Sequence, residues 1–158
     1  MRPSNPDPLL DTEFKFRRRP GPIAGDLRIS WGVALVLLII GSCRGSRATF
    51  PKLHLLAHSA RTRLGRTAMA RYIDAPAESE QPLVRFEPWL NRALAYASAQ
   101  GFVSLPKGKA AVLTATGKQQ VAALRASENV MQEEMGFVEV CARALSEGDV
   151  ARLLRSGK

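Results

Sequence analysis

Two histidines have a spacing that suggests metal chemistry. His54 and His58 are four residues apart, so on a helix both imidazoles would face the same side. A third ligand is missing, because no Asp, Glu or Cys lies between Arg44 and Ile73, and the arginines of that segment would repel a cation. We therefore predict no metal site, and expect the two histidines to pack, to form hydrogen bonds or to contact phosphate.

The two cysteines, Cys43 and Cys141, are the candidates for a nucleophile. Neither lies in a recognisable nucleophile elbow, so both are predicted to be small buried hydrophobes. The glycine spacing matches neither a phosphate-binding loop nor a dinucleotide fingerprint. Glu133 and Glu134 are expected only to solvate an exposed helix face. The sequence thus predicts a protein that is not an enzyme and has no cofactor.

Positive charge is the strongest chemical signal in the chain. Lys and Arg number 23 against 14 Asp and Glu, which leaves a formal net charge of +9. Residues 44–73 carry seven cations and no acid, and residues 101–126 again carry cations without acid. Such a balance predicts a polyanionic partner: nucleic acid, an anionic membrane or an acidic protein surface.

Any single cation can simply solvate a surface, but cations gathered in blocks favour contacts to the phosphates of double-stranded DNA. Such contacts position a protein without specifying a sequence, so we expect weak and non-specific binding. The predicted nucleic-acid-binding residues are Arg44, Arg47, Lys52, Arg61, Arg63, Arg66, Arg92, Lys107, Lys109 and Lys118.

The N-terminal part of the chain divides into an arm and an apolar run. Residues 1–28 are predicted to form an extended arm, because five prolines interrupt any continuous helix. A helix over Ile29–Cys43 would reach ~22 Å, short of the ~30 Å hydrocarbon core of a bilayer. Ile40–Cys43 also resembles the cleavage site of a lipoprotein signal peptide, which remains an alternative. We favour a helix buried on nearly all sides, in a cytoplasmic protein without a membrane partner, since two cysteines also fit a reducing compartment.

Capping residues predict the elements that follow. A helix should begin at Thr49 and end at Gly65, and a further short helix should run to Ile73. A polar loop and a short strand or extended segment over Leu83–Phe86 should lead to the next helix, which Pro88 starts.

The remainder of the chain is predicted to contain a hairpin and three helices. Gly101 should end the helix that Pro88 starts, and the Pro/Gly turn within residues 102–113 indicates a β-hairpin. Thr114 should cap a helix to about Ala126. Two more helices are expected over residues 128–145 and after Ser146.

The stretch from about Trp31 to Leu124 resembles a winged helix-turn-helix domain. Its most family-like part is Leu90–Leu124, LNRALAYASAQGFVSLPKGKAAVLTATGKQQVAAL, in which a helix ends at AQGFV, a basic hairpin tip follows, and LTATGKQQV returns to a helix. The resemblance implies a mainly α fold with a small β-hairpin. It divides the chain into a winged helix over 29–126 with an insertion at 64–86, and a C-terminal helical interaction segment over 127–158.

In size, basicity and its uncharged first helix, the chain is also similar to accessory subunits of SMC-like ATPases and to the small middle components of ABC-three-component, Lamassu-like antiphage systems. This likeness implies a non-enzymatic accessory subunit of a nucleic-acid-associated defence complex. The candidate recognition helix departs from DNA-reading helices, because it carries Arg92 as its one cation. A stand-alone DNA-binding transcriptional regulator is the alternative function.

Protein contacts are predicted in two places. Leu37 is expected in a soluble core or at a subunit contact. Met131, Met135 and Val138 form an apolar stripe in the C-terminal segment. Its occupant is left open between the first helix of the same chain, a second copy, and a larger subunit such as an SMC-like ATPase.

Overall fold

A computed structural model describes residues 25–82 and 85–156 of the chain. The predicted arm up to residue 24, and residues 83–84 of the predicted strand, lie outside this range. The elements are α1 (Gly25–Ser42), β1 (Arg47–Thr49), α2 (Phe50–Ala60), α3 (Arg63–Asp74), α4 (Pro88–Ala99), β2 (Val103–Ser104), β3 (Ala110–Leu113), α5 (Ala115–Ala126), α6 (Gln132–Ala144) and α7 (Glu147–Ser156). The expectation of a mainly helical chain with a small hairpin is confirmed.

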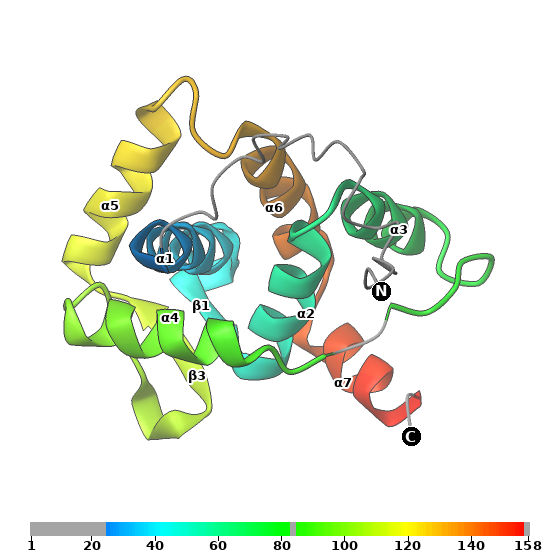
Figure 1. Cartoon of the computed structure of the whole chain (residues 1–158). Coiled ribbons are helices and arrows are strands. Elements are labelled where there is room, and N and C mark those ends of the chain that lie inside the picture. The colour runs from blue at the N-terminus through cyan, green and yellow to red at the C-terminus, as the bar shows by residue number, and fades with distance from the viewer. Residues whose placement is uncertain (1–24, 83–84, 157–158) are drawn as a thin grey trace, which may run out of the picture.

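Helix α1 is the centre of the molecule. Figure 1 shows it end-on, with α2, α4, α5 and α6 around it and the sheet beside it. Each side chain from Leu35 to Ile40 is at most 2% exposed, as expected for an apolar run that has protein on every side. No helix among the described residues is long and apolar enough to cross a bilayer.

The sheet has three antiparallel strands in the order β1-β3-β2. β2 and β3 form the predicted hairpin, with Val103 opposite Leu113. β1 was not predicted, because three residues are too few to show an alternating pattern; it pairs Ala48 with Ala111. Gly101 ends the preceding helix with a φ of 72°, as predicted.

Three predicted helix boundaries are wrong. Helix α1 begins at Gly25 rather than at Ile29, so residues 25–28 belong to the helix and not to the predicted arm. Gly65 does not end α2, but lies in the first turn of α3, where its backbone N–H donates to the Thr62 hydroxyl at 3.0 Å. A Cβ at Gly65 would lie 2.7 Å from the Ser59 carbonyl oxygen, so glycine is needed for the close approach of α2 and α3. Helix α6 begins at Gln132 rather than at 128, after Met131 in a left-handed conformation with φ 51°.

The C-terminal helices pack into the same core as α1. Met135 and Val138 of α6 are 8% and 0% exposed and belong to the cluster that includes Leu37, and Met131 is partly buried against it. Leu37 thus lies in the core, one of the two places expected for it, and Met135 and Val138 are buried within their own chain rather than left for a partner protein. Among the three occupants left open for the stripe, the structure selects the first helix.

Candidate nucleic-acid interface

Eight of the ten predicted nucleic-acid-binding side chains lie at the surface. Arg66 is not one of them, because its guanidinium donates to the Ala60 carbonyl at 2.8 Å and pairs with Glu133, which ties α3 to α6. Lys52 is 5% exposed and cannot reach a duplex. The assignment of these two residues to DNA contacts is corrected, because Arg66 is engaged within the fold and α2 is buried on most sides. The exposed residues are Arg44, Arg47, Arg61, Arg63, Arg92, Lys107, Lys109 and Lys118.

The hairpin and α4 lie side by side, and Figure 1 shows both below α1. The hairpin tip exposes Lys107 and Lys109, and the Lys109 carbonyl accepts a hydrogen bond from the Phe50 N–H at the start of α2. Arg92 is exposed on α4. From Pro88 to Ser127 the chain contains no Asp or Glu, so α4 and the hairpin carry cations and no carboxylate of their own; Glu87 at the N-cap of α4 is the acid beside them in the chain.

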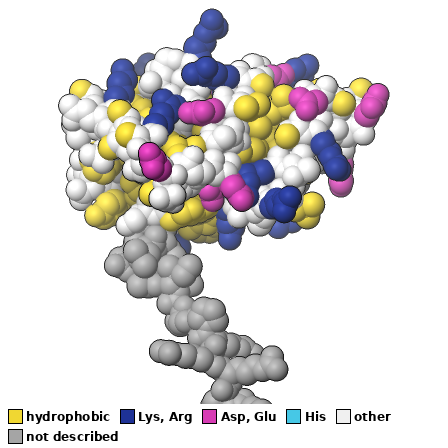
Figure 2. All heavy atoms as spheres, turned by 90° about the horizontal axis from the view of Figure 1, so that it is seen from above, with side chains coloured by type: hydrophobic (Ala, Val, Ile, Leu, Met, Phe, Trp, Pro, Cys, Tyr) yellow, Lys and Arg dark blue, Asp and Glu magenta, His cyan; other side chains and the backbone are white. Residues whose placement is uncertain are grey.

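The opposite side differs in its charge pattern. Figure 2 views the molecule from above, away from the hairpin, and shows Lys and Arg interspersed with Asp and Glu over a partly hydrophobic surface. Two ion pairs join α6 to neighbouring helices: Arg66–Glu133 to α3, and Arg125–Glu139 to α5, with 3.5 Å between Nε and Oε1. Phosphate would meet nearby carboxylates on this face, which makes it the poorer candidate for a nucleic acid.

An aromatic cleft of about 500 Å³ lies between the first turns of α1 and α4. The rings of Trp31 and Trp89 are 5.6 Å apart between centroids, and the Arg61 guanidinium lies 5.9 Å from the centre of the Trp89 ring. Arg61 is also 3.3 Å from Glu87. Arg61 is thus occupied within the fold, whereas Arg92 at the rim of the cleft has no ion pair with a described carboxylate.

Both histidines hold the start of α4 against α2. The His58 Nδ1–H donates to the Glu87 carboxylate at 2.7 Å, and the Glu87 backbone N–H donates to His54 Nδ1 at 3.0 Å. The bond from His58 lowers the pKa of Glu87, and burial lowers the pKa of His54. The predicted role in packing and hydrogen bonding is confirmed. No group of three His, Cys, Asp or Glu side chains in the described part of the chain is arranged to hold a metal.

A basic cleft of about 780 Å³ opens between the end of α1, β1 and the junction of α6 with α7. We use the name basic cleft for the space lined by Arg44, Arg47, Lys52, Arg143, Cys43 and Glu147. Sequence reasoning missed Arg143, because it belongs to an otherwise acidic segment and reaches the cleft only through the fold. Arg63 on α3 and Lys118 on α5 line neither this cleft nor the aromatic one.

Both cysteines are free and buried, as predicted. Burial raises the pKa of Cys141 to about 11. Burial also raises the pKa of Cys43, although the neighbouring Lys52 partly opposes this effect. Neither thiol therefore has the lowered pKa that an activated nucleophile requires.

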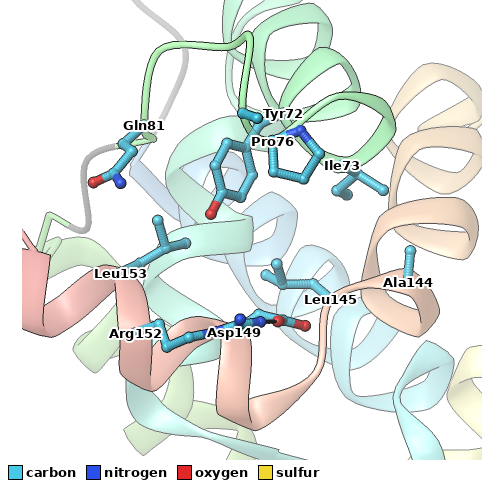
Figure 3. A pocket seen from close by; sticks show the side chains of 10 residues that line it. Tyr72, Ile73, Pro76, Gln81, Ala144, Leu145, Asp149, Arg152 and Leu153 are labelled. Carbon is cyan, nitrogen blue, oxygen red and sulfur yellow. Dashed lines mark hydrogen bonds and ion pairs between the residues drawn. The ribbon is translucent and has the colours of Figure 1, made fainter.

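A third cleft of about 440 Å³ separates α7 from the end of α3 and the loop that follows. Figure 3 shows Tyr72 and Pro76 on one side and Leu153, Asp149 and Arg152 of α7 on the other. Asp149 and Arg152 form an ion pair with each other. The charged groups of this α3–α7 cleft are consequently engaged already.

Comparisons with known proteins do not identify this site, so its interpretation rests on the geometry described above. No family model matches the sequence, and neither the curated proteins nor the solved structures contain a match. The observations that bear on function are the cations on α4, on the hairpin and in the basic cleft that form no ion pair with a described carboxylate.

Proposed function

We propose that this chain is a non-enzymatic winged-helix accessory subunit that contacts double-stranded DNA through its phosphates. The order of α1, α2, α4, hairpin and α5 supports a winged helix, with α3 and the loop after it as an insertion. The hairpin β2–β3 would be the wing, and α4 would occupy the position of the recognition helix.

The observation that carries the proposal is that α4 and the hairpin carry cations and no carboxylate of their own. Arg92, Lys107 and Lys109 are exposed there and form no ion pair with a described carboxylate. The other exposed side chains of α4 include Asn91, Ala95 and Tyr96, which offer few groups for reading base edges. Phosphate contacts without much base readout give weak binding to many sequences.

The accessory role rests on this limited capacity to read DNA and on large apolar side chains left at the surface. Leu64, Phe86 and Val140 are 81%, 65% and 64% exposed. In a larger assembly such side chains would provide contacts to a second protein. Following the sequence resemblance, we propose an SMC-like ATPase as that subunit, which co-purification of the two chains would test.

Duplex binding can be measured by fluorescence anisotropy with several unrelated sequences over a range of salt concentrations. The double variant Lys107→Ala/Lys109→Ala should weaken binding about equally for all duplexes. It should also lower the slope of log affinity against log salt by roughly 1.8, since each phosphate contact contributes about 0.9. The matched control is Arg71→Ala/Arg155→Ala, which removes two exposed cations from α3 and α7.

Three outcomes would count against the proposal. An equal loss in the control variant would mean that overall charge, and not the surface of α4 and the hairpin, binds DNA. Unchanged binding by the hairpin variant would exclude the hairpin. A tight and salt-resistant preference for one operator sequence would instead favour the stand-alone transcriptional regulator.

A further inference from the structure

Lys52 is a buried cation that forms no ion pair with a carboxylate of the described residues. It lies in the first turn of α2, is 5% exposed and lies beside Cys43, whose pKa it lowers against the larger effect of burial. Taking an ammonium group out of water is costly unless an opposite charge compensates it. Lys52 lines the basic cleft, so an anion that enters the cleft can provide that charge.

Three arginines surround the same space from separate parts of the chain. Arg44 follows α1, Arg47 begins β1 and Arg143 lies in the last turn of α6. All three are exposed, and none has an ion pair with a described carboxylate. Glu147 is the one described carboxylate that lines the cleft, so four cations face a single negative charge.

Glu147 shows how the cleft holds an anion. Its carboxylate accepts hydrogen bonds from the Thr49 backbone N–H at 3.2 Å and from the Thr49 hydroxyl at 2.5 Å. Thr49 is the N-cap of α2, where the unpaired N–H groups of the helix carry a partial positive charge. One internal carboxylate thus occupies one edge of the cleft, and the other charged groups that line it form no ion pair with a described carboxylate.

We propose that the basic cleft binds the phosphate group of a small molecule. Arginine forks match the oxygens of a phosphate, and a buried lysine adds a point charge beneath it. A space of about 780 Å³ suits a ligand as large as a mononucleotide. The residues of this site differ from the proposed DNA contacts, since none of Arg92, Lys107 and Lys109 lines the cleft.

Isothermal titration of the full chain with inorganic phosphate tests the site directly. Arg47→Ala and Arg143→Ala should each weaken phosphate binding about five- to tenfold, the loss of a charge-assisted hydrogen bond. Glu147→Gln should strengthen it about threefold, because the internal competitor loses its charge while its carbonyl oxygen still accepts from Thr49. Arg71→Ala, an equally exposed arginine on α3, should leave it unchanged.

Parallel titrations with adenosine monophosphate identify the source of the phosphate. Tighter binding than that of inorganic phosphate assigns an organic phosphate, and equal binding assigns the free ion; both support the site. The Lys107→Ala/Lys109→Ala variant should bind phosphate normally, which separates this result from the DNA experiment. The proposal fails if Arg47→Ala and Arg143→Ala bind phosphate like Arg71→Ala. It also fails if they lose duplex binding instead, because the cleft would then belong to the DNA interface.

Discussion

The two clefts that border α7 have opposite electrostatic character. At the first residue of the helix, Glu147 faces the basic cleft with its four cations. One turn further on, Asp149 and Arg152 face the α3–α7 cleft and neutralise each other. Both clefts are open hollows of several hundred cubic ångströms, so size does not distinguish them. The clefts differ in how much charge lacks an ion pair with the described residues, and a charged ligand can bind to such charge.

Removing α6 and α7 would take away one wall of each cleft. This deletion tests whether the two helices are needed for the rest of the chain to fold. A chain ending at Ala126 should lose cooperative unfolding, as followed by circular dichroism during heating. Val138, Leu145 and Val150 are each at most 3% exposed. Burial of one such side chain contributes about 1.5–3 kcal/mol, and a domain of this size has only about 5–15 kcal/mol in total. A shortened chain that still unfolds cooperatively would restore the prediction of a detachable C-terminal segment.

Replacing Lys52 of the basic cleft and Arg152 of the α3–α7 cleft by methionine should change the free energy of unfolding in opposite directions. Lys52→Met removes a buried charge that has no ion pair with a described carboxylate, so the free energy of unfolding should rise by roughly 1 kcal/mol or more, measured by urea denaturation without phosphate. The same variant should no longer be stabilised by phosphate. Arg152→Met breaks a pair at the surface and should lower stability by less than about 1 kcal/mol. Changes of the same sign would remove the distinction between the clefts.

At low pH, protonation of Asp149 in the α3–α7 cleft should lower the stability of the protein. Hydrogen bonds from the Ser146 hydroxyl and backbone N–H hold the pKa of Asp149 below its ordinary value of 3.8. A lowered pKa in the folded state stabilises the protein above the ordinary value, and this contribution is lost as the pH falls further. Asp149→Asn should therefore lower stability at pH 6 and show a smaller difference from the unchanged chain near pH 3. Thermal unfolding at both pH values measures this, and an equal difference at both would contradict it.

The smallest expected effect is a difference between the two cysteines in their rate of reaction with a thiol reagent. Cys43 lines the basic cleft next to Lys52, whereas burial keeps the pKa of Cys141 at about 11. A negatively charged aromatic disulfide reagent should therefore modify Cys43 before Cys141, since the cations of the cleft attract the reagent to Cys43. Phosphate should slow the reaction of Cys43 alone. Mass spectrometry of the modified peptides distinguishes the two sites; earlier modification of Cys141 would contradict the expected access through the cleft.

Local signals in the sequence were sufficient for most elements. The apolar run after Arg28 predicted a buried central helix, and α1 is that helix. Thr114 caps α5 by accepting a hydrogen bond from the Gly117 N–H at 3.1 Å, and Ser146 caps α7 by accepting from the Asp149 N–H at 3.1 Å. These signals act over three or four residues, so no knowledge of the fold was needed to see them. Gly65 was misassigned because its role depends on a contact outside the local pattern. It permits the close approach of α3 to the Ser59 carbonyl at the end of α2.

Only the tertiary structure determined which charges are available to a ligand. In the sequence, Lys52 and Arg66 are two cations among seven in an acid-free block. The fold buries the first in a cleft and pairs the second with Glu133, and it brings Arg143 from an acidic segment to Arg44 and Arg47. Composition fixes the total charge, and short-range spacing fixes helices and caps. Pairing between charges depends on distances across the folded chain, because Coulomb energies change steeply over a few ångströms and with burial, and no local pattern encodes them.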